Sequence, residues 1–182
     1  MIRAQADQID VVFLGQTLGS YNGINGTFFD TPSPADRSRV YGVAVGSEGV
    51  IGAGVPWVAP RATILYDGER IRFDFVADIR PRAAGLKWAI SGGNLLPVDL
   101  AREKFQADVA RRTAHTALMT KGAEVYLVVK DNSVLADFTR YAKDHGMDHA
   151  IFLDGGGSTQ LNWYGKGIKS TRRISTAVIV KE

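Results

Sequence analysis

The chain has 182 residues, of which 45% are hydrophobic and 23% are charged, and its formal net charge is +3. This composition is typical of a globular protein that buries a substantial core, and we expect one domain over residues 1–182. The small net charge argues against a nucleic-acid-binding protein, and the absence of cysteine excludes disulfides and thiolate metal sites. The two basic clusters, "STRRIST" and "ARRT", are expected to be solvated or locally paired.

The N-terminal stretch "MIRAQADQIDVVFLG" has no charged region followed by a sustained apolar run, and no other run approaches the length of a membrane span. The sequence therefore predicts a cytoplasmic protein without a membrane span, or a secreted or lumenal one if the N-terminus is processed. It does not indicate the oligomeric state.

The first half of the chain predicts strands and hairpins. "IDVVFLG" has the length and apolar character of a strand, and two Asn-Gly pairs in "SYNGINGTFFD" are turn signals. "VYGVAVGSEGVIGAG" predicts a hairpin that turns near residues 47–49, and "ATILYDGERIRFDFVADI" predicts a second hairpin that turns at residues 67–68. "LKWAISGGNLL" predicts a strand broken by its glycine pair.

The second half predicts one hairpin and one clear helix. "DLAREKFQADVARR" fits either a short helix or an irregular charged segment, and "TAHTALMTKGAEVYLVVK" predicts a hairpin that turns at Lys121-Gly122. "SVLADFTRYAKDHG" predicts a helix that ends at Gly146. Its apolar face comprises Val134, Phe138, Tyr141 and Ala142. With strands at "HAIFLD" and "RISTAVIVKE", the pattern predicts an α+β fold with a mostly antiparallel or mixed sheet and one or two packed helices.

The stretch "FLDGGGSTQL" is the first candidate for a functional site, because a strand ends at Asp154 and three glycines follow. Asp154 is either a catalytic nucleophile, base or electrostatic stabiliser, or a cap that organises the turn through its own backbone. The glycines either direct main-chain N–H groups at an anion or simply form a tight turn; they are Gly155, Gly156 and Gly157. Ser158 and Thr159 either donate hydroxyls to a substrate or make local turn hydrogen bonds.

Two other glycine-containing segments are candidates for further walls of the same pocket. Asn25 can donate and accept hydrogen bonds with sugar hydroxyls or phosphate, and Gly26 permits close approach. The alternative is a type I′ turn, for which Asn-Gly is the usual signal. Gly92 and Gly93 either border the pocket or form a β-bulge.

Arg112 is the predicted phosphate partner, since a guanidinium group presents a bidentate fork to phosphate oxygens. Arg111 is then the solvated neighbour, although the sequence alone permits the reverse. Thr113 adds a hydroxyl, and His115 is either a general acid near neutral pH or a hydrogen-bonded histidine within a strand. No oxygen ligand set for a metal can be assembled from the sequence, so we expect no required cofactor and leave a divalent cation beside Asp154 open.

Four blocks in a fixed order carry a resemblance to a known family: "NGTFF" at 25–29, "SGGNLL" at 91–96, "RTAHTAL" at 112–118 and "LDGGGSTQL" at 153–161. The chain resembles the phosphodiester glycosidase family over nearly its whole length from Asn25 onward. The resemblance implies a hydrolase that cleaves the anomeric sugar–oxygen bond of a glycosyl phosphodiester and releases free sugar and a phosphomonoester. It also implies catalytic roles for Asp154, Arg112 and Asn25.

Such a site must hold negative charge on phosphate and stabilise positive charge at the anomeric carbon. Two alternatives remain open: a non-catalytic binding module for a nucleotide sugar or another phosphorylated ligand, and a phosphodiesterase that cleaves the P–O bond, which normally needs metal ions. The expected partner is a small-molecule or glycan phosphodiester. Nucleic acid is not expected, because no platform of aromatic and basic residues is evident.

Overall fold

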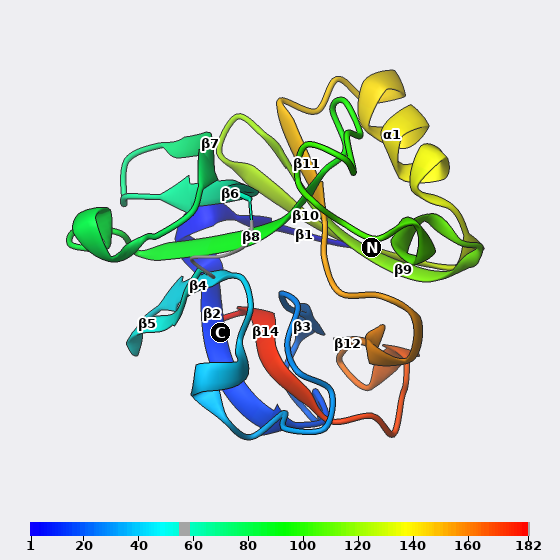
Figure 1. The fold of residues 1–182 in the computed structure, drawn as a ribbon, viewed down its shortest axis with the longest axis horizontal. Coiled ribbons are helices and arrows are strands. Elements are labelled where there is room, and N and C mark those ends of the chain that lie inside the picture. Colours follow the sequence, from blue (N-terminus) through cyan, green and yellow to red (C-terminus); the bar gives the residue numbers. More distant parts are fainter. Residues whose placement is uncertain (55–58, 182) are drawn as a thin grey trace.

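The computed structural model describes residues 1–54 and 59–181 and contains two β-sheets and one α-helix (Figure 1). The strands of the larger sheet are β1 (Ile2–Gln5), β4 (Val43–Gly46), β5 (Gly49–Ala53), β6 (Arg61–Tyr66), β7 (Ile71–Val76), β8 (Trp88–Asn94), β9 (Thr113–Lys121), β10 (Glu124–Ser133) and β11 (His149–Phe152). The strands of the smaller sheet are β2 (Ile9–Gln16), β3 (Gly23–Asn25), β12 (Leu161–Trp163), β13 (Lys166–Ile168) and β14 (Ile174–Val180). The helix is α1 (Leu135–Asp144). The predicted α+β class is therefore confirmed.

The strand order of the larger sheet is β1-β10-β9-β11-β8-β4-β5, and β6 pairs with both β7 and β8. The order of the smaller sheet is β13-β12-β3-β14-β2. In Figure 1 the smaller sheet lies below the larger one, and α1 lies on the opposite side, over β9 and β11. Within the described parts of the chain, no helix is long and apolar enough to cross a bilayer.

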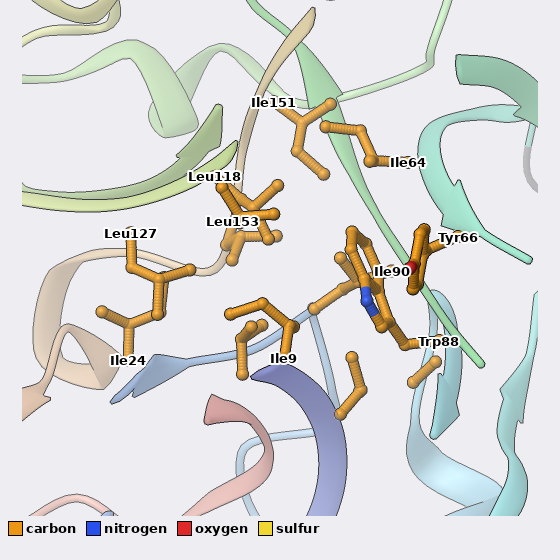
Figure 2. Close-up of a cluster of buried hydrophobic side chains, with 14 of the residues drawn as sticks. Ile9, Ile24, Ile64, Tyr66, Trp88, Ile90, Leu118, Leu127, Ile151 and Leu153 are labelled. Carbon is orange, nitrogen blue, oxygen red and sulfur yellow. The ribbon is translucent and has the colours of Figure 1, made fainter. Parts of the chain in front are cut away.

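The main hydrophobic core fills the space between the two sheets. Figure 2 shows Ile9 and Ile24 of the smaller sheet facing Leu118 and Leu127 of the larger one. Trp88 is fully buried in the same cluster, and its indole N–H donates to the Ala6 carbonyl at 2.8 Å. Burying a large aliphatic side chain contributes about 1.5–3 kcal/mol, so this interface holds the sheets together.

A second core lies between α1 and the outer face of the larger sheet. The helix confirms the prediction from "SVLADFTRYAKDHG", but its buried residues are Leu135, Phe138 and Ala142. Val134, which we predicted on this face, precedes the first helical turn with an extended backbone. It therefore falls outside the helical periodicity, and Leu135 takes its place in the core.

The three predicted hairpins are confirmed as β4–β5, β6–β7 and β9–β10. Each turn contains a glycine in the left-handed region, with φ values of 84° at Gly49, 101° at Gly68 and 57° at Gly122. Only glycine adopts this conformation without steric cost, which explains why these turn signals are readable from sequence.

Two glycine signals were misread. Gly23, predicted to lie in a turn, is part of β3, where an added β-carbon would lie 2.2 Å from the Val178 carbonyl oxygen. The predicted break at Gly92-Gly93 is also wrong, because β8 continues through both residues. An added β-carbon would lie 2.0 Å from the Phe152 carbonyl oxygen at Gly92 and 2.1 Å from the Phe152 ring at Gly93. These glycines allow close approach of neighbouring strands and side chains.

The segment between β8 and β9 is irregular and contains one short 3-10 turn, Ala107–Ala110, which settles the open choice for "DLAREKFQADVARR". Glu103 anchors it, because this buried carboxylate accepts hydrogen bonds from the N–H groups of Ala62 and Asn94, both at 2.8 Å. Burial raises the pKa of Glu103. Glu103 thereby holds this segment against the larger sheet, and Asp108, Val109 and Arg111 of the same segment line the site described next.

Candidate active site

Asp154 lies where the two sheets meet. It follows β11, its N–H donates to the Gly26 carbonyl at 3.3 Å, and its own carbonyl accepts from the Asn25 side-chain amide at 2.7 Å. Gly26 follows directly after β3. The end of a strand in the larger sheet is thus tied to the end of a strand in the smaller sheet, which fixes the backbone of Asp154.

Asn25 is a positioning residue, and it does not line the cavity beside Asp154. Asn25 is 1% exposed, and its side-chain Oδ1 accepts hydrogen bonds from the Thr116 hydroxyl at 2.7 Å and from the Gln160 N–H at 3.0 Å. Gly26 packs against Thr176, whose hydroxyl oxygen would lie 2.3 Å from an added β-carbon. Both residues therefore position the backbone of Asp154 without lining the cavity.

The Asp154 carboxylate belongs to a cavity of about 230 Å³. The lining includes Arg111, Thr113, His115, Asp154, Arg172 and all three glycines of the motif. Phe28 and Phe152 supply apolar surface. Two carboxylates, Asp108 and Asp154, two guanidinium groups and a glycine main chain without side chains thus line one small cavity.

The two cations of the cavity border the glycine loop. The Arg172 guanidinium carbon would lie 2.7 Å from a β-carbon at Gly157, and Arg111 Nη2 would lie 3.3 Å from one at Gly156. Arg111 Nη1 also donates to the Asp108 carboxylate at 3.1 Å. The glycines leave room for these side chains, so the loop and the arginines together form a positively charged edge.

Arg112, the predicted phosphate partner, lies elsewhere. Its Nη1 donates to the Asn132 carbonyl at 2.9 Å, and it is absent from the lining of the cavity. Its neighbour Arg111, predicted to be the solvated one, lines the cavity instead. The sequence left this choice open, since it does not reveal which of two adjacent residues faces a pocket.

The three glycines serve different purposes. Gly156 takes a left-handed conformation with φ of 59°, and it begins the short 3-10 turn Gly156–Ser158. At Gly155, whose backbone is extended, an added β-carbon would lie 3.2 Å from the Ala114 carbonyl oxygen. Strand β9 therefore runs close beneath the loop.

The two hydroxyl residues after the glycines face inward. Ser158 and Thr159 are buried, and neither lines the cavity. The Thr159 hydroxyl donates to the Ala114 carbonyl at 3.1 Å. The Thr159 hydroxyl therefore holds the loop on β9, and the Ser158 hydroxyl hydrogen-bonds to the Asp154 carboxylate. Thr113 is the threonine that lines the cavity.

Burial raises the pKa of Asp154 from its ordinary value to about 6. Three interactions oppose this rise by favouring the ionised form: the Ser158 hydroxyl, the Gly155 N–H at 2.9 Å and the positive charge of Arg172. At neutral pH the carboxylate is therefore mostly ionised while its proton affinity is unusually high for aspartate. A group with this property can accept a proton or stabilise positive charge near pH 7.

His115 is neutral and forms part of the cavity wall. It is 3% exposed, and burial lowers its pKa. Its Nε2 lies 3.0 Å from the Arg111 carbonyl oxygen, which can only accept, so Nε2 carries the hydrogen. Nδ1 is left as an acceptor and would lie 3.5 Å from a β-carbon at Gly155. The sequence could not decide between a general acid and a strand histidine; the hydrogen bond and the lowered pKa favour the latter.

Gly92 and Gly93 lie apart from Asp154. Gly92 lines a second cavity, of about 660 Å³, and Gly93 packs against the rings of Phe105 and Phe152. The two cavities adjoin, because Phe28, Asp108 and Val109 line both.

Sequence reasoning missed Arg172, which lies in the "STRRIST" cluster that we expected to be solvated or paired. No spacing signal could have found it, because its position opposite Gly157 arises only when the chain returns past the loop before β14. In the described part of the chain, no group of three or more His, Asp or Glu side chains could hold a metal ion.

The family model for phosphodiester glycosidases matches residues 19–181, and the chain therefore belongs to the phosphodiester glycosidase family. The catalytic domain of zebrafish N-acetylglucosamine-1-phosphodiester alpha-N-acetylglucosaminidase, auto-inhibited by its pro-peptide, is similar in structure. Its TM-score is 0.71 at 18% identity, covering 97% of this chain and 74% of that chain.

A hypothetical protein from Synechocystis is also similar, with a TM-score of 0.55 at 11% identity, covering 98% of this chain and 56% of that chain. No curated protein matches the chain. At these identities the structural likeness defines the fold, and the assignment of particular residues depends on the geometry described above.

Replacing Asn25 with alanine is expected to lower the free energy of unfolding by about 2–4 kcal/mol, because two buried partners and one part-buried partner of its side chain lose their hydrogen bonds. Asn162→Ala is the matched control, since the two hydrogen bonds of this half-buried amide, to the Tyr21 carbonyl and from the Gly165 N–H, are exposed; its effect should stay below about 1 kcal/mol. Urea denaturation measures both, and equal effects would contradict the role given to Asn25.

Asp154→Asn is expected to stabilise the protein at neutral pH. A carboxyl group whose pKa is raised in the folded state keeps a proton that the unfolded state loses, so stability falls as pH rises from about 4 to 6 and stays lower above 6. Asparagine has no such penalty, and the melting temperature at pH 7.5 should rise by about 2–4 °C, with a smaller gain at pH 5. Asp7→Asn, at an exposed carboxylate, should shift neither value. A variant that is less stable than the parent at pH 7.5 would contradict the raised pKa.

Proposed function

We propose that the cavity around Asp154 hydrolyses a glycosyl phosphodiester at its anomeric carbon–oxygen bond. Membership of the phosphodiester glycosidase family supports this class of reaction. The observation that carries the proposal is the arrangement of Asp154, whose pKa is raised, beside the guanidinium groups of Arg111 and Arg172.

The reaction needs two kinds of electrostatic help. The bond from the anomeric carbon to the phosphate oxygen breaks, its electron pair stays with the phosphomonoester, and a water oxygen joins the anomeric carbon. A phosphate leaves more readily than an alkoxide, so strong general acid help is unnecessary. Arg172 and Arg111 hold the charge that develops on the departing phosphate, because guanidinium groups bind its oxygens bidentately.

Asp154 acts in its ionised form. Its carboxylate stabilises the positive charge at the anomeric carbon and takes the proton of the attacking water, for which a pKa of about 6 is well matched near neutral pH. The neutral His115 offers Nδ1 as an acceptor to a sugar hydroxyl, and Thr113, two residues earlier on β9, offers its hydroxyl beside Gly156. Asn25 acts through the backbone of Asp154.

Asp154→Asn is expected to lower kcat/KM by about 10²–10³-fold or more on a simple glycosyl methyl phosphodiester. In the parent protein kcat/KM should rise about tenfold per pH unit below pH 6 and level off above it, because the ionised carboxylate is the active form. Asp7→Asn is the control and should behave like the parent. Full activity of folded Asp154→Asn protein would remove Asp154 from the mechanism.

Arg172→Met is expected to lower kcat/KM by about 10²-fold, because one charge that stabilises the departing phosphate is lost. Arg112→Met is the matched control from the same residue type, and it should retain activity because Arg112 points to the Asn132 carbonyl. Steady-state kinetics on the same substrate compares them. Loss of activity in Arg112→Met but not in Arg172→Met would mean that Arg112, and not Arg172, binds the departing phosphate.

Stoichiometric binding of an intact phosphodiester without turnover would instead identify a non-catalytic binding module. That outcome requires the parent protein to bind tightly and to release neither sugar nor phosphomonoester during prolonged incubation.

A further inference from the structure

The second cavity, of about 660 Å³, is nearly three times the size of the first, and the proposed reaction has so far left it unused. It adjoins the Asp154 cavity through Phe28, Asp108 and Val109. Its other walls come from the region around Tyr41, from β6 and β8, and from the segment that Glu103 anchors. The two cavities therefore have a common boundary.

The lining of this cavity is positively charged. It contains three cationic side chains, Arg39, Arg61 and Lys104, and one carboxylate, Asp108. Asp108 is already paired with Arg111. Arg39 lies 4.0 Å from both Asp30 and Asp36, whereas neither Arg61 nor Lys104 forms an ion pair with any residue that the structure describes.

The surroundings of the Arg61 guanidinium group favour binding of an anionic ligand. Its guanidinium carbon lies 3.4 Å from the centroid of the Phe105 ring, so one face of the planar group is covered. The Nε atom is buried and has no hydrogen-bond partner among residues 1–54 and 59–181. Burial lowers the pKa of Arg61, and Glu103 only partly offsets this. An anion bound at the edge of this guanidinium group offsets the free-energy cost of keeping its charge out of water.

Thr27 adds an unpartnered hydroxyl to the wall of the second cavity. It lines the same cavity, it is 1% exposed, and its buried hydroxyl has no hydrogen-bond partner within the described residues. Buried hydroxyls in folded proteins normally have a partner. Tyr41, at 41% exposed, adds an aromatic wall near the opening.

We propose that this cavity binds a second phosphate group, carried by the leaving group of the substrate. This inference rests on the proposed function: the phosphodiester lies at Asp154 and the glycine loop, and the second phosphate lies in the adjoining cavity. Arg61 is its main ligand through its edge N–H groups, Lys104 adds a second positive charge, and the Thr27 hydroxyl donates a hydrogen bond. Substrates with a second phosphate are therefore preferred over those with a neutral leaving group.

The first test measures binding and needs no turnover. Isothermal titration compares glycerol 1,3-bisphosphate, which carries two phosphates, with glycerol 3-phosphate, which carries one. The parent protein should bind the bisphosphate at least about tenfold more tightly, since a charge-assisted hydrogen bond contributes that much. Arg61→Gln and Lys104→Met should each remove most of this preference. Lys166→Met, at an exposed position on β13, is the control and should keep it.

Two results would overturn the inference: equal affinity of the parent for both ligands, or an unchanged preference in the Arg61 and Lys104 variants. Lys104 is exposed, so its variant tests the site even if Arg61→Gln fails to fold.

The second test uses kinetics. A glycosyl phosphodiester whose leaving group carries a phosphate is compared with the glycosyl methyl phosphodiester. Lys104→Met and Arg61→Gln should raise KM about tenfold for the first substrate and leave the second unchanged. Equal effects on both substrates would contradict a second phosphate site. If neither substrate were hydrolysed, the proposed reaction would fail, while the titration would still decide whether the second cavity binds phosphate.

Discussion

The side-chain amide of Asn25 makes three hydrogen bonds, two of them buried and one part-buried, and the geometry of the candidate site depends on them. Its N–H group holds the Asp154 carbonyl, while its oxygen accepts from Thr116 in the larger sheet and from Gln160 beyond the glycine loop. Only asparagine and glutamine carry both an amide N–H donor and an amide oxygen acceptor in one uncharged side chain, and glutamine is one methylene longer. The amide therefore fixes the distance between the two sheets at the point where Asp154 enters the cavity.

Burial raises the pKa of both Glu103 and Asp154, but the surroundings of the two carboxylates differ. Glu103 accepts two main-chain hydrogen bonds at 2.8 Å and anchors an irregular segment. Asp154 faces a cavity, and its charge is only partly compensated by Arg172, Ser158 and its own neighbour in the loop. Both oxygens of Glu103 accept main-chain hydrogen bonds and Glu103 lines neither cavity, whereas Asp154 lines a cavity that a ligand can enter. This contrast supports a functional role for Asp154 and a structural role for Glu103.

Local signals predicted much of the fold. The hairpins were readable because their turns need glycine at Gly49, Gly68 and Gly122, and α1 was readable from its apolar period. The Asp154 motif was also visible, because a strand followed by three glycines is a contiguous pattern. By contrast, Gly23, Gly92 and Gly93 were misread, since a glycine that allows close approach of a distant strand looks the same as one that turns the chain.

The cationic residues of the two cavities could not be predicted for the same reason. Arg61, Arg111 and Arg172 come from separate parts of the chain and meet only through the packing of the two sheets. Arg111 and Arg112 are adjacent in sequence, and their different directions depend on Asp108 and on the Asn132 carbonyl. Predicting the sites from sequence would require these long-range contacts.

The most direct test of the central claim is phosphorus NMR of a glycosyl phosphodiester, with or without a phosphate on its leaving group, incubated with the protein in oxygen-18 water. The account expects a new phosphomonoester without heavy oxygen on phosphorus, because water attacks the anomeric carbon and the sugar–oxygen bond breaks. Heavy oxygen on phosphorus would mean that the P–O bond breaks instead, and it would contradict the role given to Asp154.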